Sequence, residues 1–124
     1  CAPRQGQVAA LEALRRARED GCRDVIEMRQ SYDRRRRLMV QAFWDMGLSC
    51  FEPLGAFYVF PGIQKTGLTS EEFCTRLLKE EKVVCVPGTA FGQSGEGHIR
   101  CCYATALSQL NEALERMKHF LDRL

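Results

Sequence analysis

The chain has 124 residues, of which 45% are hydrophobic and 27% are charged, and its formal net charge is +2. This size and apolar content fit one globular domain whose core needs neither disulfides nor a metal. A charge so near zero creates no field that would attract nucleic acid or an anionic membrane surface. No apolar run approaches the ~20 residues that span a bilayer. We therefore expect no nucleic-acid partner and no membrane segment.

Seven cysteines are spread along the chain, at positions 1, 22, 50, 74, 85, 101 and 102. Their number is odd and none shares the C-x-x-C spacing of zinc or redox sites, so we expect no metal site. This usage favours reduced thiols and a cytoplasmic location. Cys101 and Cys102 would project to opposite faces of a strand, and we interpret both as structural. Because the first residue is Cys rather than Met, we expect a piece of a longer polypeptide.

Two helices are expected in the first part of the chain. Val8, Leu11 and Leu14 recur at helical spacing and predict a helix over residues 8–17. A longer helix is predicted over residues 22–46, where Gly47 supplies a stop. Its length suggests a bracing helix that connects two parts of a protein.

Four consecutive arginines, Arg34 to Arg37, fall inside the longer helix. Consecutive residues fan around most of the circumference of a helix, so the run is typical of a solvated face. Phosphate or polyanion binding is the alternative, which would call for interleaved aromatic residues or further basic clusters.

Beyond Gly47 the hydrophobic period changes to that of strands. We expect strands over residues 49–52 and 56–60, joined as a hairpin or a bent pair. Thr69 and Glu72 have the spacing of a capping box, which predicts the start of a helix that runs to about residue 81. The buried face of that helix is expected to consist of Phe73, Leu77 and Leu78.

Two more strands and a helix complete the predicted elements. A short buried strand is expected over residues 83–86, and a second over residues 98–104 with Arg100 and Ile99 on opposite faces. The glycine-rich loop between them does not fit a phosphate loop, because a strand follows it where a helix N-terminus would be needed. Ser108 is expected to cap the last helix. The apolar seam of that helix would be Leu110, Leu114, Met117 and Leu121.

This order of elements predicts the α/β class. Helices and strands follow one another without a repeat or a low-complexity linker, which describes a sheet layered against helices. We expect a two-layer small domain in which a short mixed sheet packs on helices, preceded by a long bracing helix.

Arg100 is the candidate functional residue that the strand pattern singles out. A permanent charge among mostly apolar neighbours is costly unless it meets an anion. Two interpretations stand equal on the residues alone: an ion pair with Glu52 or Glu96, and the binding of a carboxylate or phosphate ligand. His98 and His119 are better explained as structural residues, the latter near a helix C-terminus.

Several segments carry a resemblance to a known family. The opening CAP with its alanine-rich helix, the helix around Tyr32 to Arg37, and the runs GAFYVFP, VVCVPGTAFG and GHIRCCYA occur in order. Together they resemble the C-terminal part of class I/II aminotransferases, the pyridoxal-phosphate enzymes of fold type I. The resemblance implies that residues 1–29 are a helical segment linked to a large cofactor domain outside this chain. Residues 30–124 would then form the small C-terminal domain.

The resemblance also implies roles for residues. Arg100 holds the place of the arginine that binds the α-carboxylate of the substrate, and Phe91 lies in the loop that lines the pocket. In this family the cofactor lysine comes from the large domain. The lysines of this chain lack the Ser-x-x-Lys or Ser-Lys setting of that residue: Lys65, Lys79, Lys82 and Lys118. We therefore expect no catalytic, cofactor-binding or metal-binding residue here.

The whole enzyme is expected to bind pyridoxal 5'-phosphate mainly through the large domain. It would exchange an amino group between an amino acid and a 2-oxo acid, as part of amino acid metabolism, and would work as a homodimer. The fragment alone is expected to be inactive. Its sequence leaves the identity of the amino acid open.

Other functions stay open at this point. An aminotransferase-like ligand-sensing domain of a transcription regulator would carry a helix-turn-helix upstream. A pyridoxal-phosphate lyase or synthase of the same fold would use the same arginine. A non-catalytic interaction domain would bind no cofactor.

Overall fold

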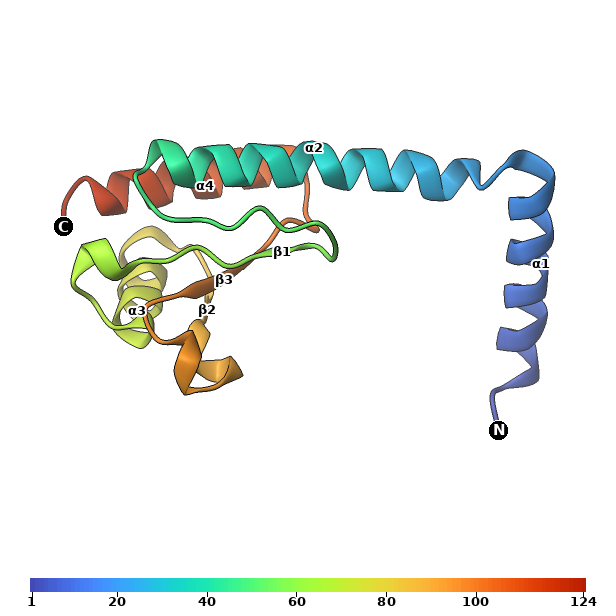
Figure 1. The fold of residues 1–124 in the computed structure, drawn as a ribbon, viewed down its shortest axis with the longest axis horizontal. Coiled ribbons are helices and arrows are strands. Elements are labelled where there is room, and N and C mark those ends of the chain that lie inside the picture. Colours follow the sequence, from blue (N-terminus) through green and yellow to red (C-terminus); the bar gives the residue numbers. More distant parts are fainter. The chain divides into compact units, whose positions relative to one another are not determined.

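Four α-helices and three short strands make up the computed structural model, which describes all residues 1–124 (Figure 1). The chain divides into two compact units, Cys1–Ser31 and Tyr32–Leu124. None of the helices combines the length and the apolar character that a membrane crossing demands.

The first unit is built from α1 (Arg4–Asp20) and the start of α2 (Arg23–Asp45). The helix expected from Val8 onward is thus confirmed and extends further at both ends. It ends at Gly21, whose φ of +70° is left-handed, and the carboxylate of Asp20 accepts a hydrogen bond from the Cys22 N–H at 2.9 Å. No side chain of α1 is buried.

Within Tyr32–Leu124, helix α2 supplies Met39, Val40 and Phe43 to the core. The predicted long helix is confirmed. Its arginine run is only partly the solvated face that the sequence indicated, because the Arg36 side chain is 13% exposed and pairs with two carboxylates. Arg36 lies 2.7 Å from Asp33 Oδ1 and 2.5 Å from Glu52 Oε1.

The strands form one sheet in the order β1-β3-β2: β1 (Tyr58–Val59), β2 (Val86–Pro87) and β3 (Ile99–Cys102). The central β3 runs antiparallel to both neighbours, with Tyr58 opposite Cys102 and Val86 opposite Arg100. The α/β class is confirmed, but the expected mixed sheet is wrong. Residues 88–98 join β2 to β3 and contain no α-helix, whereas a parallel pair needs a crossover of a dozen or more residues, usually a helix.

None of the four expected strands has its full predicted length: 56–60 is a strand only over Tyr58–Val59, and 98–104 only over Ile99–Cys102. The segment 49–52 forms only an isolated bridge between Ser49 and Gly62. The Cys50 carbonyl there accepts a hydrogen bond from Trp44 Nε1 at 3.0 Å. It is therefore not available to pair with a neighbouring strand. The strand expected over 83–86 begins only at Val86.

Helices α3 (Ser70–Glu81) and α4 (Leu107–Leu121) are the other two helices of this unit. The capping box of Thr69 and Glu72 is present, as predicted. Two details are wrong: Leu78 is 46% exposed, and Ser108 lies inside α4, whose N-cap is Ala106 without a side-chain hydrogen bond.

One core holds the second unit together. It draws on α2, the sheet, α3 and α4, and Figure 1 shows the strands below α2 and α4. From β3 and the residue after it, Ile99, Cys101 and Tyr103 face inward, as the alternation predicted. The Phe73 ring of α3 meets Phe120 of α4 edge to face at 5.3 Å. Phe120 takes the fully buried place expected of Leu121, which is only half-buried.

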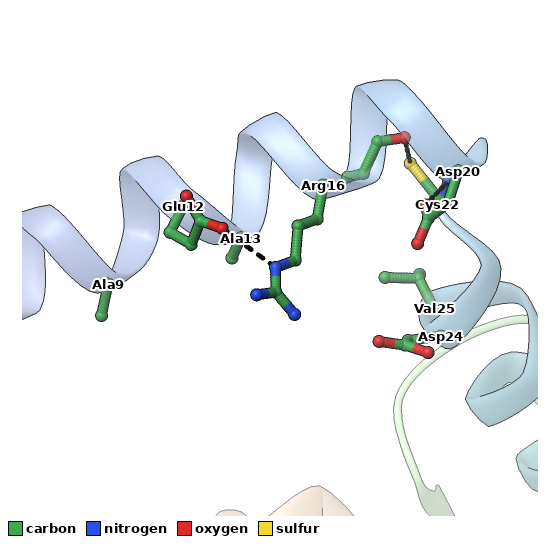
Figure 2. Close-up of a pocket in the computed structure, with 9 residues that line it drawn as sticks. Ala9, Glu12, Ala13, Arg16, Asp20, Cys22, Asp24 and Val25 are labelled. Carbon is green, nitrogen blue, oxygen red and sulfur yellow. Dashed lines mark hydrogen bonds and ion pairs between the residues drawn. The ribbon is translucent and has the colours of Figure 1, made fainter.

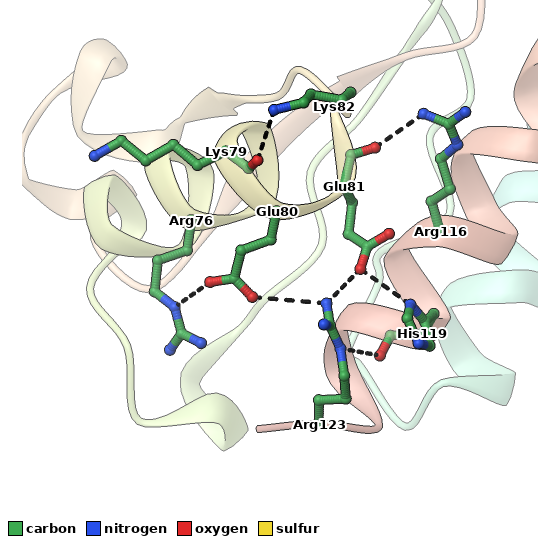
Figure 3. A network of polar contacts seen from close by, with 8 residues as sticks. All are labelled: Arg76, Lys79, Glu80, Glu81, Lys82, Arg116, His119 and Arg123. Atoms are coloured by element: carbon green, nitrogen blue, oxygen red, sulfur yellow. Dashed lines mark hydrogen bonds and ion pairs between the residues drawn. The ribbon is translucent and has the colours of Figure 1, made fainter.

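A polar network ties the C-terminal end of α3 to α4 (Figure 3). Arg116 Nη1 donates to the main-chain carbonyl of Glu81 at 3.0 Å, and the Glu81 carboxylate meets His119 Nδ1 at 3.0 Å and also Arg123. The network satisfies a carbonyl at a helix end, a group that has no partner inside the helix. His119 therefore has a structural role between two helices.

Candidate substrate-carboxylate site

Arg100 lies on the outward face of β3, between two aromatic rings. Its guanidinium carbon is 4.3 Å from the centre of the Tyr58 ring and 4.6 Å from that of Phe91. Both distances are within the ~6 Å at which a cation is attracted to a ring face. Tyr58 belongs to the neighbouring β1 and Phe91 to the loop after β2, so residues far apart in the sequence bring two rings to the same charge.

Arg100 makes no ion pair in this structure. Both carboxylates that the sequence offered as partners are engaged elsewhere. Glu52 pairs with Arg36, and Glu96 Oε1 accepts the Ser70 N–H at 2.8 Å. The interpretation of Arg100 as half of a salt bridge with Glu52 or Glu96 is therefore wrong, and its guanidinium contacts no carboxylate of this chain.

Further rings adjoin the arginine on this face. Phe60 meets Phe91 edge to face at 6.1 Å and stacks on His98 at 5.3 Å with an interplanar angle of 11°. Phe60 is 37% exposed and Phe91 52%. The surface beside Arg100 is thus apolar, aromatic and open within this chain.

The loop that carries Phe91 is shaped by two close-packed glycines. It contains two short 3₁₀ helices, η2 (Gly88–Phe91) and η3 (Gln93–Gly95). Gly88 begins the first turn and Gly95 ends the second. Both are buried, and a Cβ built on either would overlap the backbone of the other. Only glycine permits that approach. The Gly88 N–H also donates to the His98 carbonyl at 2.8 Å, which joins the loop to the start of β3.

The N-terminus of α3 anchors the other end of the loop. Ser70 is fully buried, and its Oγ accepts the His98 N–H at 3.2 Å. The Ser70 N–H is one of the helix donors without an intrahelical partner, and the Glu96 carboxylate satisfies it. Hydrogen bonds thus hold the loop and β3 in register, as the position of Arg100 against Phe91 requires.

His98 has the structural role that the sequence indicated. Its ring stacks on Phe60, and Nδ1 lies 3.2 Å from the Glu96 carbonyl oxygen. No three His, Cys, Asp or Glu side chains gather as metal ligands would.

The four lysines of the chain lie on its surface. Lys65 lies on the short turn η1 (Gln64–Thr66), and the others lie on α3, just after it or on α4. All four are exposed, and the Lys82 Nζ donates to the Lys79 carbonyl at 2.8 Å. None of the contacts of Arg100 involves a lysine.

A pocket in the first unit offers no comparable chemistry (Figure 2). It lies where α1 turns into α2 and has a mostly apolar lining that includes Ala9, Ala13 and Val25. The arginine that points into it, Arg16, is already paired with Glu12 at 3.0 Å and is exposed. The arginine of this pocket is thus neutralised within α1, whereas Arg100 on β3 pairs with no carboxylate.

The sequence pointed to Arg100 and, through the family resemblance, to Phe91, but it gave no sign that Tyr58 and Phe60 lie beside them. Alternation around the buried Val59 indicates only that Tyr58 and Phe60 share the opposite face. What the sequence could not supply was the pairing of β1 with β3, which places that face beside Arg100.

Comparison with known proteins gives a consistent family. The family model described as aminotransferase class I and II matches residues 1–117. The Bacillus subtilis (strain 168) protein YugH, which carries a provisional aminotransferase name, is 54% identical over 123 residues, covering 99% of this chain and 31% of YugH. Aromatic-amino-acid aminotransferase 2 of Thermococcus litoralis is 51% identical over 115 residues, 93% of this chain and 29% of that protein.

Solved structures agree with the sequence comparison. The crystal structure of an aromatic aminotransferase from Pyrococcus horikoshii OT3 superposes with a TM-score of 0.88 at 50% identity, over 94% of this chain and 31% of that one. The chain thus spans about 30% of the length of the relatives it matches.

Proposed function

Because the chain belongs to the class I and II aminotransferases, we propose that it is the C-terminal part of an enzyme that moves an amino group between an amino acid and a 2-oxo acid. The observation that carries the proposal is Arg100, a strand arginine with two aromatic partners and no acidic one. Since the chain covers about 30% of its relatives, the activity and both substrates belong to the proposal.

In this proposal Arg100 binds the α-carboxylate of the substrate. A guanidinium is planar, and its N–H groups lie in that plane, so a carboxylate can accept two parallel hydrogen bonds. Rings that lie over the guanidinium carbon contact its faces and leave the edges to the ligand. The contacts with Tyr58 and Phe91 support a group that is oriented before substrate arrives, which lowers the entropic cost of binding.

Phe91 has a second proposed role beside the substrate. Its ring is half-exposed next to Arg100 and touches Phe60. An apolar wall at this place would exclude water from the carboxylate, and a hydrogen bond to a charged group is stronger when water is excluded. We assign Phe91 to the pocket lining on this basis.

The arrangement of the whole enzyme is also part of the proposal. Residues 30–124 would form the small domain, and residues 1–29 would lead to it from a larger cofactor domain. The enzyme would be a cytoplasmic homodimer that binds pyridoxal 5'-phosphate, a group that acts as an electron sink when bound. The exposed lysines of this chain do not fit the role of the cofactor lysine, so we propose that the chain alone is inactive.

The competing functions are less well supported. The relatives that match nearly the whole chain carry aminotransferase names, among them aromatic-amino-acid and aspartate aminotransferases. These names do not favour a ligand-sensing domain of a transcription regulator, a lyase or synthase, or a non-catalytic interaction domain.

The decisive experiment replaces Arg100 in the full-length enzyme and measures kcat/KM for the amino donor. Arg100→Ala should lower kcat/KM by about 100- to 1,000-fold, or about 3–4 kcal/mol, because the carboxylate loses a charged bidentate partner. Arg100→Lys should recover only part of this loss, since an ammonium lacks the planar fork.

Arg34→Ala is a matched control, because Arg34 is an exposed arginine on α2. It should leave kcat/KM unchanged. An Arg100→Ala enzyme with parental kcat/KM would rule out the proposed role of this arginine. A full-length protein that transfers no amino group from any amino acid would rule out the proposed function itself.

A further inference from the structure

Two thiols outside the proposed site face each other across β2 and β3. The register that puts Val86 opposite Arg100 puts the preceding Cys85 opposite Cys101. Their Sγ atoms are 3.5 Å apart. The five other cysteines have no thiol partner of this kind in the structure.

The pair occupies the type of strand position at which a cross-link fits. The Gly88 N–H donates to the His98 carbonyl, which marks a hydrogen-bonded pair of residues. Such pairs alternate along an antiparallel ladder, so Val86 and Arg100 are hydrogen-bonded and Cys85 and Cys101 are not. Non-hydrogen-bonded partners have Cα atoms about 4.5 Å apart. That value falls within the range of about 4.4–6.8 Å that a disulfide spans.

The two thiols differ in exposure. Cys101 is 6% exposed, whereas Cys85 is only half-buried. The hydrogen bond with Cys85, together with burial, raises the pKa of the Cys101 thiol. An oxidant from solution therefore meets Cys85 first, and Cys101 is placed to react with the product.

We propose that Cys85 and Cys101 form an oxidisable dithiol that hydroperoxides convert to a disulfide. The Cys85 thiolate attacks the peroxide, the O–O bond breaks, and Cys85 becomes a sulfenic acid. The leaving oxygen takes up the proton that the thiol released and becomes an alcohol, or water when the oxidant is hydrogen peroxide. The Cys101 sulfur then attacks the Cys85 sulfur, the S–O bond breaks, and the hydroxyl leaves with the Cys101 proton as water. Two thiols are oxidised by two electrons, and the peroxide is reduced by two. This proposal does not depend on the proposed function.

The remaining buried thiols are poor competitors. Burial raises the pKa of the Cys74 thiol to about 12 and also raises that of Cys50. A thiol reacts through its thiolate, so neither should attack a peroxide readily at neutral pH. The pKa of the Cys101 thiol is raised as well, and what distinguishes Cys101 is that its sulfur lies 3.5 Å from that of Cys85. The Cys50 Sγ lies 3.6 Å from the Phe51 carbonyl oxygen and makes no contact with a second sulfur like that between Cys85 and Cys101.

The test uses the 124-residue chain with its exposed cysteines removed by Cys1→Ser, Cys22→Ser and Cys102→Ser, so that disulfides between molecules cannot form. The remaining four thiols are Cys50, Cys74, Cys85 and Cys101. After treatment with equimolar hydrogen peroxide and denaturation, free thiols should fall from four to two, the mass should fall by about 2 Da, and dithiothreitol should reverse both.

Two further variants in the same background make the result specific. On oxidation the Cys74→Ala variant should still lose two free thiols. The Cys85→Ser variant should form no intramolecular disulfide. Peptide mapping of the oxidised chain should recover the Cys85–Cys101 cross-link. An unchanged thiol count, or a cross-link that contains Cys50 or Cys74, would overturn the proposal.

Discussion

The two units of the chain, Cys1–Ser31 and Tyr32–Leu124, differ in what covers their apolar side chains. Helix α1 exposes Val8, Leu11 and Leu14 by 59%, 50% and 66%. Helix α4 has residues of the same kind and similar spacing, and its Leu110 and Leu114 are buried. Hydrophobic periodicity therefore predicts a helix and its apolar face in both units, but it says nothing of where the covering surface lies.

The two units also differ in whether they have a hydrophobic core of their own. All the buried hydrophobic residues of the chain belong to Tyr32–Leu124. Since burial of apolar surface is the main favourable term in folding, we expect the stability of the chain to reside in this second unit. The predictions that follow test this contrast, from the largest expected effect to the smallest.

A core substitution should separate the two units most clearly. Phe73 is fully buried on α3, and Phe73→Ala should lower the free energy of unfolding by about 3–5 kcal/mol through lost burial and a cavity. Leu14→Ala on α1 should change it by no more than about 0.5 kcal/mol. Urea unfolding followed by far-UV circular dichroism measures both. A loss of several kcal/mol for Leu14→Ala would show that α1 is covered within this chain.

Removal of a helix cap should have an intermediate effect. Thr69 accepts the Glu72 N–H in the capping box of α3, whereas the N-cap of α1, Pro3, makes no such bond. Thr69→Ala should therefore cost about 1 kcal/mol. Thr75→Ala, at an exposed position of the same helix, is the control and should cost less. Equal losses from the two variants would argue against a specific contribution of the cap.

The smallest effect should come from acid. The hydrogen bond from Arg36 lowers the pKa of Asp33, and Arg37 adds to this. The unfolded chain, with an aspartate pKa of about 3.9, then takes up this proton before the folded chain does. The stabilisation is thus complete above about pH 4 and is lost as the pH falls through the lower folded-state pKa.

Thermal unfolding of Asp33→Asn over this acidic range measures the contribution of Asp33. The variant should lose less stability on acidification than the parent chain does. Asp24→Asn, at the other end of α2 and in the first unit, is the matched control. If Asp33→Asn follows the same pH dependence as the parent, the ion pair with Arg36 does not contribute to stability.

Features that depend on neighbouring residues could be predicted from the sequence. The capping box needs only Thr69 and Glu72, three positions apart, and α3 begins where they indicate. The inward face of β3 follows from strict alternation through Ile99 and Cys101. Ser108 misled the prediction because a good capping residue is no guide when the backbone of Ala106 already starts the helix.

Features that depend on pairing between distant segments could not be predicted. Arg100 was evident as a charge among apolar residues, but its contact with Tyr58 requires the pairing of β1 with β3. The approach of Cys85 to Cys101 likewise depends on the register of β2 against β3. Segment 49–52 has strand-like residues, yet the bond from Trp44 to Cys50 removes a carbonyl that a strand would need.

The mutual contact of Gly88 and Gly95 bears on how the loop beside Arg100 can vary in sequence. A side chain at either position would overlap the backbone of the other, so no substitution at one glycine makes room for a side chain at the other. A library randomised across this loop and selected for folding should recover both glycines together, while exposed Thr89, Ala90 and Ser94 accept many residues. The exposed positions of the loop can therefore vary in sequence beside Arg100, while the two glycines keep the path of its backbone fixed.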